Sequence, residues 1–202
     1  MLPLIETRSG IGFWPLEPRA VDINIDDIAH ALSQQCRFSG HTREHYSVAE
    51  HCVRVADVLE DWGCSTEVQL WGLLHDASEA YLVDIPSPLK CLPEFAPYRE
   101  AEARLMAAVC ERFGLPIVEP VEVRAADGVL LATEARDLMA FAPEHWTKLT
   151  HAPLDERIVP WGSQQARRAF RLRFDSLMCA RGQTDPAPSP SRAPTLIPNG
   201  GV

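Results

Sequence analysis

The stretch Leu70-Trp71-Gly72-Leu73-Leu74-His75-Asp76-Ala77-Ser78-Glu79-Ala80-Tyr81 combines an apolar helical pattern with three ionisable side chains. Its apolar residues recur at the spacings that are typical of one face of an α-helix. The sequence Asp84-Ile85-Pro86-Ser87-Pro88 follows and predicts the end of that helix. In a continuous helix over residues 70–81, Glu79 lies on the face that carries His75 and Asp76. We therefore expect three ionisable groups together beside a buried stripe.

The same periodicity continues outward along the chain and predicts an all-α bundle. Apolar stripes mark further helices that begin near residues 25, 48, 97, 121 and 163, whereas strand patterns are scarce. Ser47 and Glu50 fit a capping box at the start of one helix, and Ser163 fits a cap for the last helix. Gly114 provides a stop signal for the helix that begins near residue 97.

Length and composition allow one globular domain with two irregular ends. The 202 residues include 46% hydrophobic and 23% charged side chains, which is near the globular average. Residues 1–21 mix glycine and proline with Phe13 and Trp14, so we expect an irregular arm with a short hairpin. Residues 182–202 are rich in proline and predict a disordered tail. Residues 22–181 then form the single globular domain.

Charge and cysteine content limit the partners and the compartment. A net charge of −9 argues against binding to nucleic-acid polymers, because such proteins concentrate Lys and Arg to displace phosphate counterions. The six cysteines form no Cys-x-x-Cys pair, as in a reduced protein. No stretch approaches the ~18 apolar residues that span a bilayer, and no secretory signal is present. We expect a cytoplasmic protein that binds no membrane.

Four residues on successive predicted helices are candidate metal ligands: His51, His75, Asp76 and Asp127. Ionisable groups beside an apolar stripe need partners or a cation to offset their desolvation. Mixed nitrogen and oxygen donors suit Zn²⁺, Co²⁺ or Mn²⁺ and leave positions open to water and substrate. Each residue taken alone has a structural interpretation, as a hydrogen-bonded core histidine or, for the Asp before Gly128, as a turn residue.

Longer motifs resemble the HD-domain metal-dependent phosphohydrolases. The family pattern is matched by His51, then His75-Asp76, then Asp127, in that order along the chain. The further matching segments are Arg37-Phe38, Gly40-His41-Thr42-Arg43, Tyr46-Ser47-Val48-Ala49-Glu50-His51, His75-Asp76-Ala77-Ser78-Glu79-Ala80-Tyr81, Asp84-Ile85-Pro86-Ser87-Pro88-Leu89-Lys90, Ala126-Asp127 and Ala132-Thr133-Glu134-Ala135-Arg136. They cover residues 22–140 and are most similar to the small 5′-deoxynucleotidase branch, which includes phage dATP triphosphohydrolases.

The resemblance implies an HD-domain helical bundle with one divalent metal, which could be Zn, Co, Mn or Mg. The implied ligands are the four residues named above, and the implied substrate is a deoxynucleotide. By analogy Glu79 orients the attacking water or takes its proton, and Asp84 lies near the sugar and the reacting phosphate. Glu134 is expected to support the ligands. Homo-oligomerisation is also implied.

The resemblance further implies a basic clamp for the phosphate. Arg37, Lys90 and Arg124 occupy positions similar to the phosphate contacts of the family, and Phe38 stands where an aromatic side chain could stack on a base. The structural alternative for each cation is a surface ion pair, and Phe38 could equally belong to the core.

Several functions stay open at the level of sequence. The branch contains enzymes that release phosphate from deoxynucleoside monophosphates and enzymes that release triphosphate from deoxynucleoside triphosphates. Alternatives are an HD phosphodiesterase or alarmone hydrolase, and a nucleotide-binding regulatory module without catalysis. Competent residues at every ligand position, together with Glu79, argue against the module.

Overall fold

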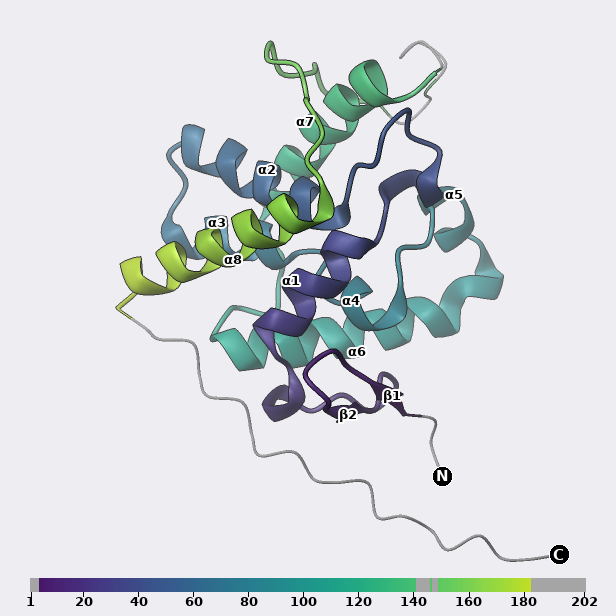
Figure 1. The fold of residues 1–202 in the computed structure, drawn as a ribbon, viewed down its shortest axis with the longest axis vertical. Coiled ribbons are helices and arrows are strands. Elements are labelled where there is room, and N and C mark those ends of the chain that lie inside the picture. The colour runs from purple at the N-terminus through teal and green to yellow at the C-terminus, as the bar shows by residue number, and fades with distance from the viewer. Residues whose placement is uncertain (1–3, 141–145, 147–148, 183–202) are drawn as a thin grey trace, which may run out of the picture.

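The computed structural model describes residues 4–140, 146 and 149–182, and it confirms the all-α fold (Figure 1). The main helices are α1 (Ile25–Gln34), α2 (Val48–Asp61), α3 (Thr66–Leu74), α6 (Ala96–Phe113), α7 (Val121–Leu138) and α8 (Ser163–Ala180). Shorter turns of helix are η1 (Ala20–Asp22), η2 (Arg37–Gly40), α4 (Glu79–Leu82), α5 (Ser87–Lys90) and η3 (Pro93–Phe95). Apart from residue 182, the predicted tail lies outside the described residues.

Helix α2 lies at the centre of the bundle, in contact with α1, α3, α7 and α8. Its predicted apolar stripe is fully buried, as Val55 and Leu59 illustrate. Figure 1 shows α8 running across the bundle near α1 and α3, and these pairs are in contact. The central position of α2 puts His51, in its first turn, among the buried residues.

The N-terminal arm contains the expected hairpin. Strands β1 (Ile5–Glu6) and β2 (Gly12–Phe13) pair antiparallel, with Ile5 opposite Phe13. The Phe13 ring is fully buried and stacks on Tyr81 with 4.1 Å between ring centroids. The arm therefore packs into the same hydrophobic core as the helical domain.

The predicted continuous helix over residues 70–81 is wrong. Helix α3 ends at Leu74, turns occupy residues 75–78, and α4 begins at Glu79. The His75 ring donates from Nδ1 to the Gly72 carbonyl at 2.7 Å, which is the acceptor that the next amide would use in a continuing helix. The interruption places His75 and Asp76 in turns. Glu79 therefore does not have the orientation relative to them that a continuous helix would give it.

Two predicted caps also differ from the structure. The Ser47 side chain accepts from the Glu50 amide as expected, but the Glu50 carboxylate binds Arg54 and the Trp161 amide instead of completing a capping box. Helix α8 is capped by the extended backbone of Gly162, and Ser163 is its first residue, so the prediction for Ser163 was wrong.

Two further expectations concerned the reduced state of the cysteines and membrane-spanning segments. The six cysteines, all of which lie among the described residues, form no disulfide with one another. Within the part of the chain that the structure describes, no helix has both the length and the apolar content of a membrane span.

Candidate metal centre and adjoining cavity

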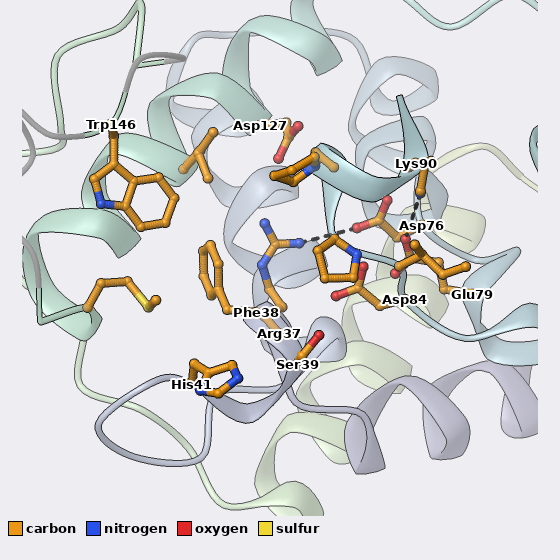
Figure 2. Close-up of a pocket in the computed structure, with 16 residues that line it drawn as sticks. Arg37, Phe38, Ser39, His41, Asp76, Glu79, Asp84, Lys90, Asp127 and Trp146 are labelled. Atoms are coloured by element: carbon orange, nitrogen blue, oxygen red, sulfur yellow. Dashed lines mark hydrogen bonds and ion pairs between the residues drawn. The ribbon is translucent and has the colours of Figure 1, made fainter. Parts of the chain in front are cut away.

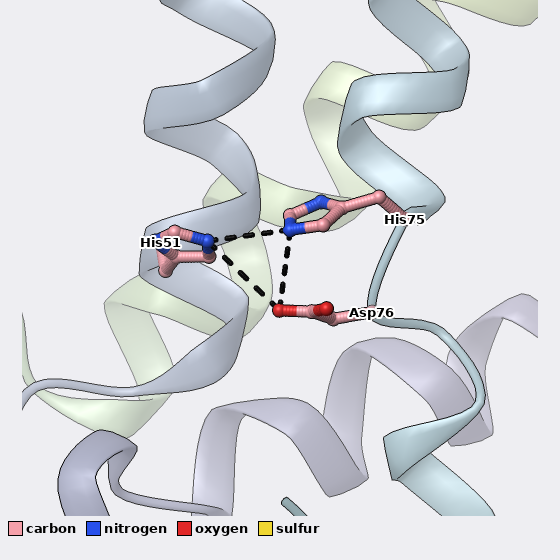
Figure 3. A group of neighbouring side chains, drawn as sticks. All are labelled: His51, His75 and Asp76. Carbon is pink, nitrogen blue, oxygen red and sulfur yellow. Dashed lines mark hydrogen bonds and ion pairs between the residues drawn. The ribbon is translucent and has the colours of Figure 1, made fainter. Parts of the chain in front are cut away.

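Three predicted metal ligands converge at one point of the structure (Figure 3). His51 comes from α2, whereas His75 and Asp76 come from the turns that interrupt the helix after Leu74. The Nε2 atoms of the two histidines are 3.3 Å apart, and Asp76 Oδ2 is 3.2 Å from His75 Nε2 and 3.9 Å from His51 Nε2. This His-His-Asp cluster could hold a metal ion.

Asp127 joins the cluster from α7 through His51. Its Oδ1 lies 3.1 Å from His51 Nε2, and its side chain is 42% exposed, whereas the His51 side chain is completely buried. The fourth predicted ligand is therefore at the edge of the cluster, next to solvent. Its ordinary pKa of 3.8 is lowered to about 2: burial acts in the opposite direction, but the hydrogen bond to His51 and the positive charges of His51, His75 and Arg37 together outweigh it.

The second nitrogen of each histidine ring has an acceptor as its partner. His51 Nδ1 is 2.6 Å from Glu134 Oε1, and His75 Nδ1 is 2.7 Å from the Gly72 carbonyl oxygen. Each Nδ1 must therefore carry a proton, so a neutral ring presents a lone pair at Nε2. Two lone pairs and two carboxylate oxygens then face one another, and only a cation or bound protons can stabilise such a group.

The spacing of these atoms fits a small divalent ion. Ligands at about 2.0–2.2 Å from an ion in tetrahedral or octahedral geometry are separated by about 2.9–3.5 Å. The separations of 3.1, 3.2 and 3.3 Å fall in this range, whereas the 3.9 Å between His51 Nε2 and Asp76 Oδ2 exceeds it. The donor set and its spacing therefore suit a divalent metal.

The charges around the cluster also favour a bound cation. Burial lowers the pKa of His75, but the Asp76 carboxylate and Cys52 together more than compensate and hold this pKa well above its ordinary value. Burial raises the pKa of Asp76, yet His75 first and then His51 and Arg37 bring it below its usual range. Without a metal the cluster attracts protons, which indicates the position where positive charge is stabilised.

A cavity of about 740 Å³ opens beside the cluster (Figure 2). Its lining includes most of the residues predicted for the site: Arg37, Phe38, Asp76, Glu79, Asp84, Lys90 and Asp127. The residues come from η2, the turns before α4, the proline-containing loop, α5 and α7. Segments that are far apart in the sequence thus meet at one hollow with the candidate metal centre in its wall.

Glu79 is a buried carboxyl group in the cavity wall. Its Oε1 lies 3.4 Å from Lys90 Nζ, and its Oε2 has no hydrogen-bond partner among the described residues. Burial, followed by the negative charges of Asp76 and Asp84, raises its pKa from 4.5 to about 9. A carboxyl oxygen of this kind is a site for a proton or a water molecule.

Arg37 connects the cavity to the metal cluster. Its Nη1 lies 3.5 Å from Asp76 Oδ2, and its Nη2 lies 3.1 Å from Glu134 Oε2. The carboxylate of Glu134 therefore contacts both His51 and Arg37, in agreement with the support that the sequence predicts. The Arg37 side chain is 13% exposed, so its charge acts where water is largely excluded.

Lys90 lines the cavity, whereas Arg124 does not. Lys90 Nζ lies between Glu102, at 2.8 Å, and Glu79. The Arg124 side chain is 77% exposed and pairs with Glu119 at 2.8 Å. The structure therefore does not bring Arg124 to the other predicted phosphate contacts, and its surface ion pair corresponds to the structural alternative.

Comparison with known proteins gives the family of the chain. The protein is 38% identical over 179 residues to the uncharacterized protein YfdR of Escherichia coli (strain K12), with 87% of this chain and 96% of YfdR covered. The chain belongs to the YfdR family. The uncharacterized protein RCAP_rcc00048 of Rhodobacter capsulatus is 39% identical over 178 residues, with 81% of this chain and 89% of that protein covered. No family model matches the chain.

In this member of the YfdR family, an aromatic pair forms the cavity wall away from Lys90 (Figure 2). Phe38 and Trp146 meet edge to face with 5.7 Å between centroids, and the Arg37 guanidinium lies 5.4 Å from the Phe38 ring centre. Phe38 and Ser39 have positive φ angles of 53° and 52°, a backbone conformation that is uncommon outside glycine. Sequence analysis missed Trp146, because no periodic pattern or motif surrounds it.

Proposed function

We propose that this chain is an HD-type, metal-dependent phosphohydrolase that releases phosphate from deoxynucleoside 5′-monophosphates. The convergence of metal-ligand atoms from His51, His75 and Asp76 beside a cavity with two cationic side chains carries the proposal. The motifs that resemble the HD-domain phosphohydrolases support the same chemistry. The ligands are His51, His75, Asp76 and Asp127, and the cofactor is one divalent ion.

The acidic residues of the cavity handle the proton and orient the substrate. His51, His75, Asp76 and Asp127 would hold a divalent cation, which would lower the pKa of water and neutralise charge on phosphoryl oxygens. The positive charge of the cation would also favour ionisation of Glu79, whose buried Oε2 has no partner among the described residues and could then accept the proton of the attacking water. Asp84 lines the same cavity, where its carboxylate can accept a hydrogen bond from the sugar hydroxyl.

The number of cationic groups favours a monophosphate over a triphosphate. Among the described residues, Arg37 and Lys90 are the Arg and Lys side chains in the cavity lining. Each is already paired with a carboxylate behind it, Arg37 with Glu134 and Lys90 with Glu102. Because each cationic side chain is offset by its own carboxylate, the two charges of a divalent ion remain, and they match a phosphate dianion, whereas a triphosphate carries roughly twice that charge.

The aromatic pair gives the base a binding surface. Phe38 and Trp146 present ring surface at the cavity wall, and Arg37 lies between the Phe38 ring and Asp76 in Figure 2. A nucleobase that stacks on these rings leaves its phosphate free to reach Arg37 and the metal cluster. The distribution of apolar and charged groups along the cavity therefore matches the two ends of a nucleotide.

A chromatographic assay of the purified protein tests the proposal. Deoxynucleoside 5′-monophosphates, the triphosphates and their ribose analogues are incubated with Mn²⁺, with Co²⁺ or with a chelator. We expect phosphate and deoxynucleoside from the monophosphates, with turnover abolished by the chelator and by Asp76→Asn. Triphosphate release from deoxynucleoside triphosphates would overturn the substrate assignment. Full turnover by Asp76→Asn would overturn the proposed site.

A further inference from the structure

The side-chain amide of Gln35 bridges two backbone groups of the cavity wall. Its Nε2 donates to the Glu79 carbonyl at 2.9 Å, and its Oε1 accepts from the Asp84 amide at 3.0 Å. The side chains of Glu79 and Asp84 both line the cavity. One amide group therefore contacts the backbone of both acidic residues to which the proposed function gives a role in the reaction.

The bridge encloses a residue with an unfavourable backbone conformation. Val83, which directly precedes Asp84, has a φ of 72°, and a β-branched residue rarely adopts this conformation. Its amide donates to the Glu79 carbonyl at 2.9 Å, and its own carbonyl accepts from the Tyr98 hydroxyl at 2.6 Å. Such a conformation persists only where neighbouring groups hold it, and the Gln35 amide is one of those groups.

Gln35 is itself held by the bundle. Its backbone amide donates to the Ala31 carbonyl at the end of α1, and its carbonyl accepts from the Val48 amide at the start of α2. Gln35 and Cys36 have extended backbone angles, so the side chains of Gln35 and Arg37 leave the chain on the same side. This short segment thus carries both Gln35, which contacts the backbone of the two acidic residues, and Arg37, which contacts the metal cluster through Asp76.

We infer that Gln35 is a positioning residue that sets the places of the Glu79 and Asp84 carboxylates relative to Arg37. The inference rests on the proposed function. Without the amide, the turn at Val83 loses one restraint on each side, and the two carboxylates are no longer fixed against the substrate. Gln35 contacts no predicted metal ligand through its side-chain amide, so metal binding does not depend on it.

Gln35→Leu tests this role, with Gln34→Leu as the matched control at the exposed last residue of α1. Three quantities are measured in the full-length protein: amide hydrogen exchange of residues 79–90, Mn²⁺ affinity, and the kinetics of phosphate release. In Gln35→Leu we expect Asp84 to exchange at least about tenfold faster and kcat to fall at least about tenfold. KM and Mn²⁺ affinity should stay within about threefold, since Arg37, Lys90 and the ligands are retained. Gln34→Leu should match the wild type.

Gln35→Glu adds a pH-dependent test in a side chain of the same shape. A protonated carboxyl can donate to the Glu79 carbonyl and accept from the Asp84 amide, whereas an ionised one can only accept. The ionised form leaves the Glu79 carbonyl without this donor and repels it, so the Val83 amide, which donates to the same carbonyl, should exchange faster. Relative to the wild type at each pH, protection of the Val83 amide should recover as the pH falls from about 7 to about 4. This recovery separates positioning by the amide from a merely structural effect of the substitution.

The outcomes separate this inference from the proposed function. Unchanged exchange at Asp84 in Gln35→Leu would overturn the bridge, and faster exchange with wild-type kcat would overturn its role in positioning. No turnover of any nucleotide by the wild type would overturn the proposed function. The bridge would then be judged by the exchange of Asp84 in Gln35→Leu and of Val83 in Gln35→Glu.

Discussion

At the scale of single residues, Glu134 has the clearest effect on the metal cluster. Its carboxylate fixes the His51 ring through Nδ1 and also pairs with Arg37. A glutamine removes the charge and presents an amide that can orient the wrong way. We expect Glu134→Gln to weaken Mn²⁺ binding about 10–100-fold, measured by competition with a fluorescent chelator.

The control for this prediction is Glu122→Gln. Glu122 is exposed in the first turn of the same helix, so its variant should bind Mn²⁺ as the wild type does. Equal affinities in the two variants would contradict the role of Glu134.

The titration of Glu79 makes a prediction for the metal-free protein. Burial, then Asp76 and Asp84, raises its folded-state pKa from 4.5 to about 9, so the folded state binds this proton more tightly than the unfolded chain. The contribution to stability is complete below about pH 4.5 and is lost as the pH rises toward about 9. Chemical denaturation in a chelator should show that Glu79→Gln loses less stability than the wild type over this interval. Parallel pH profiles would refute the assignment.

Lys90 and Arg124 provide a matched pair of cations. Lys90 lines the cavity, whereas Arg124 is exposed outside it. A charged hydrogen bond to phosphate contributes about 1.5–3 kcal/mol, so Lys90→Met should raise KM for a deoxynucleoside monophosphate about 10–100-fold with little change in Mn²⁺ affinity. Arg124→Met should leave both quantities unchanged. A larger increase of KM in Arg124→Met than in Lys90→Met would contradict the assignment of Lys90 to phosphate binding.

At the scale of elements, the end of α3 explains why Glu79 does not share a helix face with His75. Spacing of apolar residues predicts how much of a segment can bury one face, but it contains no information on competition for a single carbonyl group. The His75 ring takes the Gly72 carbonyl, and α3 ends at Leu74. The predicted helix over residues 70–81 is therefore divided at the residues that form the site.

Gly72 also determines how closely α3 approaches α2. A Cβ at this position would collide with Leu59 Cδ1 and lie 3.3 Å from Val55 Cγ1, both on α2. Overpacking costs about 1–3 kcal/mol, against a gain of about 1 kcal/mol in helix propensity, so Gly72→Ala should lower the free energy of unfolding by up to about 2 kcal/mol. Urea denaturation measures this change. Gly12→Ala, whose added Cβ would lie at an ordinary contact distance of 3.8 Å from Leu4 Cδ1, is the control, and equal effects would contradict the packing argument.

At the scale of the whole molecule, the fold could be predicted from periodicity, because amphipathic stripes cover most of the chain. Helices α1, α2, α6 and α7 lie where their stripes predict. His51, His75 and Asp76 were found through residue type and motif, and the structure brings them together. Gln35 carries no such signal, because its role depends on backbone groups that are more than forty residues away.

Arg124 shows that spacing along a helix does not predict where a long side chain points. It precedes Asp127 by three residues in α7, so both occupy neighbouring positions on the helix surface. A long side chain can nevertheless turn away from its neighbour, and the Glu119 carboxylate holds Arg124 at the surface. The direction of such a side chain depends on partners outside the helix, which spacing does not predict.

The central claim is that the His51, His75 and Asp76 cluster binds one divalent ion. Calorimetric titration of the metal-stripped protein with Mn²⁺ tests it most directly, with Asp76→Asn and the exposed-surface variant Asp175→Asn measured in parallel. We predict one ion per chain in the wild type and in Asp175→Asn, and loss of that binding in Asp76→Asn. No saturable binding by the wild type, or the same binding in Asp76→Asn, would contradict the account.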